Sequence, residues 1–139
     1  MRQNQITITI KTSGVGLVEI TKDIAVWLRE QNVKMGQVTL FCRHTSASLT
    51  IQENADPDVQ VDLVSFFNRL VPEGVSWFQH TDEGPDDMPA HIKGALTDVS
   101  LTIPVANGQM TLGTWQGIYL FEHRRRPHRR EVVLHFIGE

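Results

Sequence analysis

The segment from His80 to His91 gathers the side chains best suited to hold a cation. It reads HTDEGPDDMPAH, with two histidines and four carboxylates around a Gly-Pro turn. Carboxylates this close together repel one another unless water, a basic partner or a metal ion compensates them. Imidazole combined with carboxylate suits zinc, manganese or iron, whereas carboxylates alone suit magnesium. The segment predicts a divalent-metal site; the alternative is an acidic surface turn, since Pro, Gly and Asp are common turn residues.

A second polar group falls where an expected strand ends and an expected helix begins. It consists of HTSAS from His44 to Ser48 and ENAD from Glu53 to Asp56. Polar side chains at the ends of elements often form sites, and polar neighbours would let His44 act as a base or a metal ligand. A Ser–His nucleophile pair lacks the surrounding nucleophile-elbow sequence. The alternative is that the hydroxyl residues serve the turn and Asp56 only caps the helix.

The segment GTWQGIYLFE, from Gly113 to Glu122, suits a planar ligand. Trp115 could stack on a ring, and Gln116 could hydrogen-bond to its edge. The glycines on either side of the TWQ triplet predict close backbone approach or a bulge. Packing of Trp115 in the core is the alternative.

Basic residues are concentrated in one short stretch. Its five arginines, uninterrupted by an acid, are Arg124, Arg125, Arg126, Arg129 and Arg130. Without them the chain carries eight more acidic than basic side chains, although its formal net charge is only -3. Guanidinium groups can clamp phosphate, so the stretch predicts a local anion site or, alternatively, a solvated hairpin tip. A nucleic-acid partner is not expected, because such binders are usually basic over a whole face.

The bulk composition indicates one globular domain. The 139 residues are 40% hydrophobic, enough for one core, and we expect a single domain over residues 1–139. No apolar run approaches the roughly 18 residues of a membrane span, and the N-terminal residues lack a signal-peptide hydrophobic region. We therefore expect a soluble cytoplasmic protein without a membrane partner. The single cysteine, Cys42, is expected to be a small buried hydrophobe rather than a catalytic thiol.

Alternating apolar and polar residues, rich in β-branched side chains, predict strands in both halves of the chain. The expected strands cover residues 5–11, 17–20, 37–44, 48–52, 100–105, 114–123 and 131–137. Gly14 and Gly16 mark a turn between the first two strands, so a β-hairpin should open the fold.

Two helices are expected between these strands. The first follows Thr21, its expected N-cap, and the second begins at Asp56-Pro57, a strong start signal. The apolar face of the second helix comprises Val59, Leu63, Phe66, Phe67 and Leu70. A short helical turn is expected over Ala90 to Ala95. The order is approximately ββαββαββββ, without the regular alternation that forces a parallel sheet, so we predict an α+β sandwich.

Taken together, these segments resemble the YjbQ family over essentially the whole chain. The matching segments are His44–Ser48, Glu53–Pro57, His80–Lys93, Gly113–Ile118 and Arg130–Glu139. The resemblance implies an α+β fold with two strands, a helix, two strands, a helix and four strands, assembled as a homotrimer. It also implies a secondary thiamine-phosphate synthase activity, which joins a hydroxymethylpyrimidine diphosphate to a thiazole phosphate.

The resemblance places the family motif on named residues of this chain. These are His44, Ser46, Glu53, Asp56, His80, Glu83, Asp87, His91, Thr114, Gln116 and Arg130. The departures lie mainly between Arg124 and His128.

From the resemblance and the residue types we assign three roles. The expected ligands of a divalent ion, Mg²⁺ or Zn²⁺, are His44, His80, Glu83, Asp87 and His91. The expected catalytic residues are His44, Ser46, Glu53, Asp87 and His91. The expected substrate-binding residues are Lys93, Thr114, Trp115, Gln116 and Arg130.

The leading hypothesis is a transferase in which the ion neutralises a diphosphate leaving group. The alternatives are a metal-stabilised trimer that binds or senses a small ligand, and a metal-dependent hydrolase of a phosphorylated or damaged metabolite.

Overall fold

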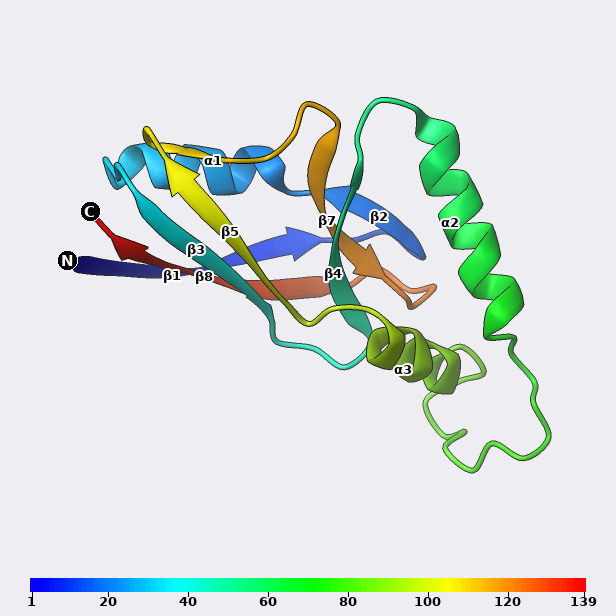
Figure 1. Cartoon of the computed structure of the whole chain (residues 1–139). Coiled ribbons are helices and arrows are strands. Elements are labelled where there is room, and N and C mark those ends of the chain that lie inside the picture. The colour runs from blue at the N-terminus through cyan, green and yellow to red at the C-terminus, as the bar shows by residue number, and fades with distance from the viewer.

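The structure, a computed structural model, describes residues 1–139 (Figure 1). Its elements are β1 (Arg2–Lys11), β2 (Gly16–Glu19), α1 (Thr21–Glu30), β3 (Gly36–Cys42), β4 (Ala47–Glu53), α2 (Pro57–Leu70), α3 (Asp87–Leu96), β5 (Ser100–Ala106), β6 (Gln109–Met110), β7 (Gln116–Glu122) and β8 (Arg129–Gly138). The expected order is confirmed with one addition. Where the sequence predicts only a helical turn over Ala90 to Ala95, the chain forms the ten-residue helix α3.

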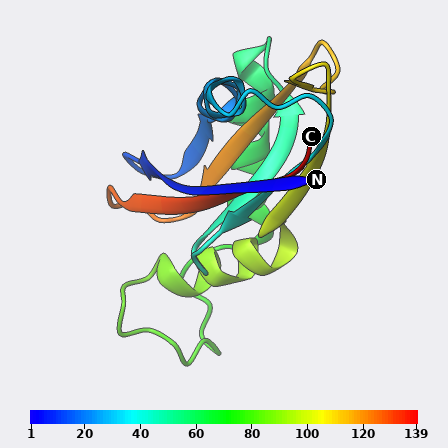
Figure 2. The same cartoon turned by 90° about the vertical axis from the view of Figure 1, so that its left-hand side faces the viewer.

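The strands form two antiparallel sheets that share one core. The five-stranded sheet has the order β1-β8-β3-β5-β6, and the three-stranded sheet has the order β2-β7-β4. Buried apolar side chains of β3, β5 and β8 meet those of β4, β7 and α1 in one cluster of 18 residues, which include Cys42 as expected. Figures 1 and 2 show the termini side by side at one end of the larger sheet. The α+β prediction is therefore confirmed.

The expected N-terminal hairpin is wrong, because β1 and β2 belong to different sheets. Strand β1 pairs with β8 over ten residues, and β2 pairs with β7. Gly14, with a φ of +136°, lies in the segment that carries the chain from one sheet to the other, and Gly16, with a φ of +156°, begins β2. The turn signal is genuine, but the long partner strand β8 outcompetes a local hairpin for the hydrogen bonds of β1.

The two predicted helix starts have different outcomes. Asp56 caps α2 as expected, since its side chain accepts a hydrogen bond from the backbone N–H of Asp58 at 2.9 Å. For α1 the N-cap is Ile20, and Thr21 is already helical. The Thr21 hydroxyl instead accepts from the N–H of Ile118 at 2.8 Å, which ties α1 to β7. None of the three helices combines the length and apolar character needed to cross a membrane.

Strand β7 is covered on both faces. Ile118 and Leu120 enter the shared core, whereas Phe121 packs edge-on against Phe67 of α2 at 5.5 Å between ring centroids. The close approach predicted for Gly117 is confirmed, because a Cβ there would lie 2.8 Å from a carboxylate oxygen of Glu19. This packing carries the end of β7 to α3, where polar side chains gather.

Candidate functional site

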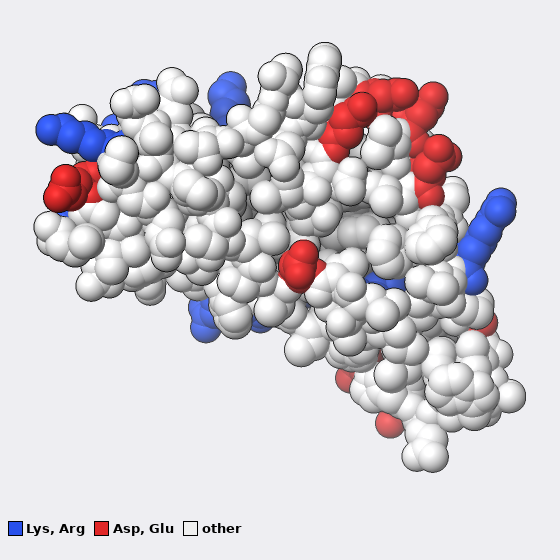
Figure 3. Space-filling view, viewed as in Figure 1, with Lys and Arg blue, Asp and Glu red and all other residues white.

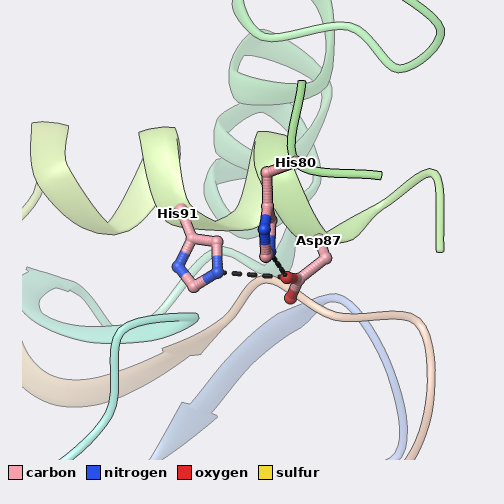
Figure 4. A group of neighbouring side chains, drawn as sticks. All are labelled: His80, Asp87 and His91. Atoms are coloured by element: carbon pink, nitrogen blue, oxygen red, sulfur yellow. Dashed lines mark hydrogen bonds and ion pairs between the residues drawn. The ribbon is translucent and has the colours of Figure 1, made fainter. Parts of the chain in front are cut away.

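His80, Asp87 and His91 converge beside α3 (Figure 4). The Asp87 Oδ2 atom lies 2.7 Å from Nε2 of His80 and 3.1 Å from Nε2 of His91. One potential ligand atom from each residue lies within 4.8 Å of the other two. The structure thus brings together three of the five residues that the sequence suggests as metal ligands.

Local structure fixes the orientation of His91. Asp87 and His91 are four residues apart in α3, so one helical turn places them on the same face. The Nδ1 atom of His91 lies 3.1 Å from the carbonyl oxygen of Thr45. Gly94 allows the β3–β4 connection, which carries Thr45, to approach α3 closely, because a Cβ at Gly94 would lie 3.0 Å from the same carbonyl oxygen. A carbonyl only accepts hydrogen bonds, so Nδ1 of His91 donates and Nε2 is directed at Asp87.

Arg124, in the connection between β7 and β8, ties three parts of the acidic loop together. Its Nη1 donates to Asp87 Oδ1 at 2.6 Å, and its Nε donates to Asp86 Oδ2 at 3.1 Å. Its Nη2 donates to the backbone carbonyl of Glu83 at 2.9 Å. The Glu83 side chain is exposed and contributes no atom to the three-residue cluster. Part of the arginine-rich stretch therefore neutralises carboxylates within the chain.

These contacts keep Asp87 ionised. Burial works to raise its pKa, but the hydrogen bond from His80 and the attraction of His91 and Arg124 outweigh burial, so the pKa lies below its ordinary value. An ionised carboxylate with two imidazole nitrogens is a donor set that suits zinc or iron. The side chains of His80 and His91 are 48% and 32% exposed, so a ligand from solvent could reach an ion held here.

His44 lies near this cluster but is not part of it. Its Nε2 accepts from the backbone N–H of Glu131 at 2.7 Å. Burial, followed by the positive charge of Arg130, lowers the pKa of His44. His44 and His91 nevertheless line one hollow of about 250 Å³. A small molecule bound there would touch both residues.

A buried ion pair, Glu122–Arg130, forms a second polar centre. Arg130 Nε donates to Glu122 Oε1 at 2.8 Å, and Nη2 donates to Oε2 at 2.5 Å. Nη2 also donates to Oγ of Ser46 at 2.9 Å. Arg130 and Ser46 are therefore in contact, but the hydrogen bonds of Arg130 go to Ser46 and Glu122 within the chain.

Glu122 is the residue that sequence reasoning missed. It is fully buried and also accepts from the Thr12 hydroxyl at 2.6 Å and from the N–H of His123 at 3.0 Å. Burial works to raise its pKa, but the hydrogen bonds from Arg130 and Thr12 outweigh burial and hold the pKa below its ordinary value. The available signal was a carboxylate directly after the apolar run from Ile118 to Phe121, where only a paired charge is tolerated.

Four other predicted residues lie at the opposite end of the smaller sheet: Glu53, Thr114, Trp115 and Gln116. Glu53 pairs in register with Gln116, whereas Ala47, at the α3 end of β4, pairs with Glu122. Seven residues of β4 separate the two ends by about 20 Å. Trp115 is 63% exposed, which contradicts core packing.

The surface at that far end is acidic. Acidic side chains gather over the start of α2 in Figure 3, where Asp56 and Asp58 are exposed. At the same end, Thr114 and Trp115 precede β7 and Gln116 is its first residue, and all three are exposed. Within one chain these three residues cannot contact a ligand at the His80–Asp87–His91 cluster.

Lys93 is separated from the cluster in another way. It lies two residues beyond His91 in α3, a rotation of about 200° around the helix axis. Its Nζ donates to Oδ1 of Asn68 at 2.7 Å, and it is 5% exposed. Burial lowers the pKa of Lys93. Lys93 therefore faces a different cavity, which lies between α2, α3 and the β7–β8 connection.

Comparisons with known proteins agree with this fold over nearly the whole chain. The family model described as "UPF0047 protein YjbQ-like" matches residues 5–139. The UPF0047 protein sll1880 of Synechocystis is 54% identical over 99% of this chain and 94% of its own length. The UPF0047 protein YjbQ of Escherichia coli O157:H7 is 42% identical over 99% of this chain and 98% of its own length.

A solved structure gives the same result. The crystal structure of a YjbQ/UPF0047 family protein from Clostridium acetobutylicum is 37% identical, with a TM-score of 0.86 over 95% of this chain and 99% of its own. The match of the family model, the sequence identities and the shared fold together show that the chain belongs to the YjbQ (UPF0047) family.

Proposed function

We propose that this protein is a divalent-metal-dependent enzyme acting on a phosphorylated heterocycle, with His80, Asp87 and His91 holding the ion. The arrangement around His91 carries the proposal. Its Nδ1 is engaged by the carbonyl of Thr45, and its Nε2 faces Asp87 Oδ2 across 3.1 Å. Nε2 must then be either protonated or bound to a cation, since a nitrogen lone pair and a carboxylate repel. Two nitrogens and one oxygen favour zinc over magnesium.

The proposed reaction is the one that the family resemblance implies. A thiazole phosphate attacks a hydroxymethylpyrimidine diphosphate through its ring nitrogen, forming a bond to the methylene carbon. The bond between that carbon and the diphosphate oxygen breaks, and the diphosphate leaves with the electron pair. This step needs stabilisation of the leaving charge more than a strong base, and a bound ion would supply it. His44, which lines the hollow beside His91, is our candidate for orienting the substrate.

We further propose that the working form is a homotrimer, so that one site can draw residues from two chains. The separation of Trp115 and Gln116 from the His80–Asp87–His91 cluster supports this, because both groups can meet only between copies. Uncovered apolar side chains on α2 also support it: Val61, Phe66 and Leu70 are 60%, 58% and 53% exposed. Exposed apolar surface of this kind often marks an interface.

A metal-stabilised ligand-binding or regulatory protein is the second candidate. The hydrogen bonds of Arg124 to Asp86 and Asp87 favour it, because they tie the β7–β8 connection to α3 independently of any turnover. An ion at the same carboxylate could therefore serve only to rigidify this region.

The test is thiamine-phosphate formation by untagged protein before chelation, after chelation, and after Zn²⁺ or Mg²⁺ is restored. The informative variants are His91→Ala and Asp87→Asn. His135→Ala is the matched control, because His135 lies in β8 and the hydrogen bond of its side chain goes to Gln5, at 3.0 Å. The enzyme proposal predicts loss of turnover on chelation and a loss of about 100-fold in His91→Ala.

The control should retain full turnover. Metal binding that raises thermal stability without any turnover would favour the second candidate. Turnover that survives both chelation and His91→Ala would contradict the enzyme proposal.

A further inference from the structure

We propose a second ligand site, a cavity between α1 and the β5–β6 turn that binds a small organic phosphate monoester, with Arg29 and Lys34 holding the phosphate. The cavity has a volume of about 570 Å³, within the range of small-molecule sites. Figures 1 and 2 show α1 and the β5–β6 turn away from α3, and β3, whose seven residues span about 20 Å, runs between the two regions. The site is therefore distinct from the His80–Asp87–His91 cluster and does not rest on the proposed enzymatic function.

The apolar part of the cavity wall comes from one face of α1 and from the segment around β6. Ala25 and Leu28 lie on the same helical face, because they are three residues apart in α1. Leu28 is 1% exposed and also belongs to the core, while Met110 and Leu112 line the cavity and pack against the core. This lining suits a ligand with a compact apolar or aromatic body.

Backbone contacts fix the position of the cavity walls. The N–H of Gly108 donates to the carbonyl of Lys34 at 2.9 Å, which ties the β5–β6 turn to the connection between α1 and β3. A Cβ at Gly108 would lie 3.1 Å from the carbonyl oxygen of Val33, so glycine allows this close approach. Asn32 and Asn107 both have a φ of +53°, a left-handed conformation that asparagine tolerates in turns. The fold itself therefore positions the walls, as in most small-molecule sites.

The charge of the lining is purely positive. Arg29 and Lys34 line the cavity without any acidic side chain, and both are exposed. Neither forms an ion pair within the chain, whereas Arg124, Arg125 and Arg130 are all paired with carboxylates. Two cations without a compensating acid attract a dianion more strongly than a monoanion.

Neutral donors complete the match to a phosphate. The side-chain amides of Asn32, Asn107 and Gln109 line the same cavity, and each offers two N–H donors. A phosphate monoester carries three terminal acceptor oxygens and up to two negative charges. Its phosphate therefore matches the two cations and the amides, and its organic group matches the apolar wall.

The test is titration of phenyl phosphate into the full-length protein at about pH 8, where the monoester is a dianion, with binding followed by calorimetry and NMR. The protein is treated with a chelator, so that no metal ion can take up phosphate at the His80–Asp87–His91 cluster. Inorganic phosphate, which lacks the ring, and phenol, which lacks the charge, are the matched ligand controls.

The protein variants are Arg29→Met and Lys34→Met, each of which keeps a long side chain without the charge. Lys22→Met is the matched control, because Lys22 lies in α1 but does not line the cavity. The expected result is saturable binding of one phenyl phosphate per chain, weakened at least about tenfold by Arg29→Met and by Lys34→Met and unchanged by Lys22→Met. Inorganic phosphate and phenol should each bind at least about tenfold more weakly than phenyl phosphate.

The proposal is overturned if phenyl phosphate does not bind saturably, if either control ligand binds equally well, or if the folded variants bind as the wild type does. Arg29 also lies in the last turn of α1, where a cation stabilises the negative end of the helix. If Arg29→Met lowers stability without lowering affinity, Arg29 serves only the helix and the proposal fails. If Arg29→Met does not fold, Lys34→Met must show the loss of affinity instead.

Discussion

Replacing Arg130 with methionine should destabilise this protein more than any exposed substitution. The change removes the donors at 2.8 Å and 2.5 Å from the two carboxylate oxygens of Glu122, and the donor at 2.9 Å from Ser46 Oγ. Glu122 would remain fully buried, with the Thr12 hydroxyl and backbone N–H groups as its remaining donors. Breaking a buried ion pair costs about 3–5 kcal/mol. The retained donors place the expected loss near the lower end, about 3 kcal/mol.

The reciprocal change, Glu122→Leu, leaves Arg130 buried without its partner and should cost a similar amount. The double variant removes both charges, so its loss of stability should fall below the sum of the single losses by about 2 kcal/mol or more. Urea unfolding can be followed by the fluorescence of Trp27, which is 6% exposed in the core. Measurements at several protein concentrations separate unfolding from dissociation of an oligomer.

Arg129→Met is the matched control, because Arg129 is the neighbouring arginine but is exposed. Its effect should stay within about 0.5 kcal/mol. Additive single losses, or a loss below about 1 kcal/mol for Arg130→Met, would refute the idea that this pair organises the junction of β7 and β8.

Three further predictions concern the fold. Asp56→Ala should lower stability by about 1 kcal/mol in urea unfolding, because it removes the cap of α2, and Asp56→Asn should restore most of it. Gly117→Ala should lower the melting temperature, because the new Cβ would lie 2.8 Å from a carboxylate oxygen of Glu19; an unchanged melting temperature would show that Glu19 moves freely aside. The His123 ring should stay neutral in the folded protein as the pH falls from 6.5 towards 3, because burial lowers its pKa from 6.5 to about 3. The ring in the unfolded chain gains a proton over this range, so the free energy of unfolding should decline as the pH falls. An NMR titration of the His123 ring with an ordinary midpoint would contradict this prediction.

The sequence predicts much of this fold because its signals are local. Alternation in β8 and the Asp56-Pro57 start of α2 depend on neighbouring residues alone, and both appear in the structure. The pairing of β1 was not predictable in this way. Its partner is more than a hundred residues away along the chain, and the turn at Gly14 and Gly16 resembles that of a hairpin. Local turn chemistry cannot reveal which distant strand competes for the same hydrogen bonds.

In the candidate site, too, the contacts between residues close in sequence were predictable, and those between distant residues were not. His80, Asp87 and His91 are close in sequence, and the four-residue spacing within α3 makes the approach of two of them predictable. Glu122 and His123 gained their importance only from residues that the fold brings to them, such as Arg130 and Ser48. Conversely, Trp115 has a side chain suited to ligand binding, but it lies at the end of β4 and β7 that is far from the His80–Asp87–His91 cluster.

The most direct test of the proposed metal centre is calorimetric titration of Zn²⁺ into untagged, chelator-stripped protein. The arrangement of His80, Asp87 and His91 predicts one ion per chain, with affinity reduced at least about tenfold by Asp87→Asn and by His91→Ala, and unchanged by His135→Ala. Absence of saturable binding, or equal affinity in all four proteins, would contradict a metal site at these residues and with it the proposed enzymatic function.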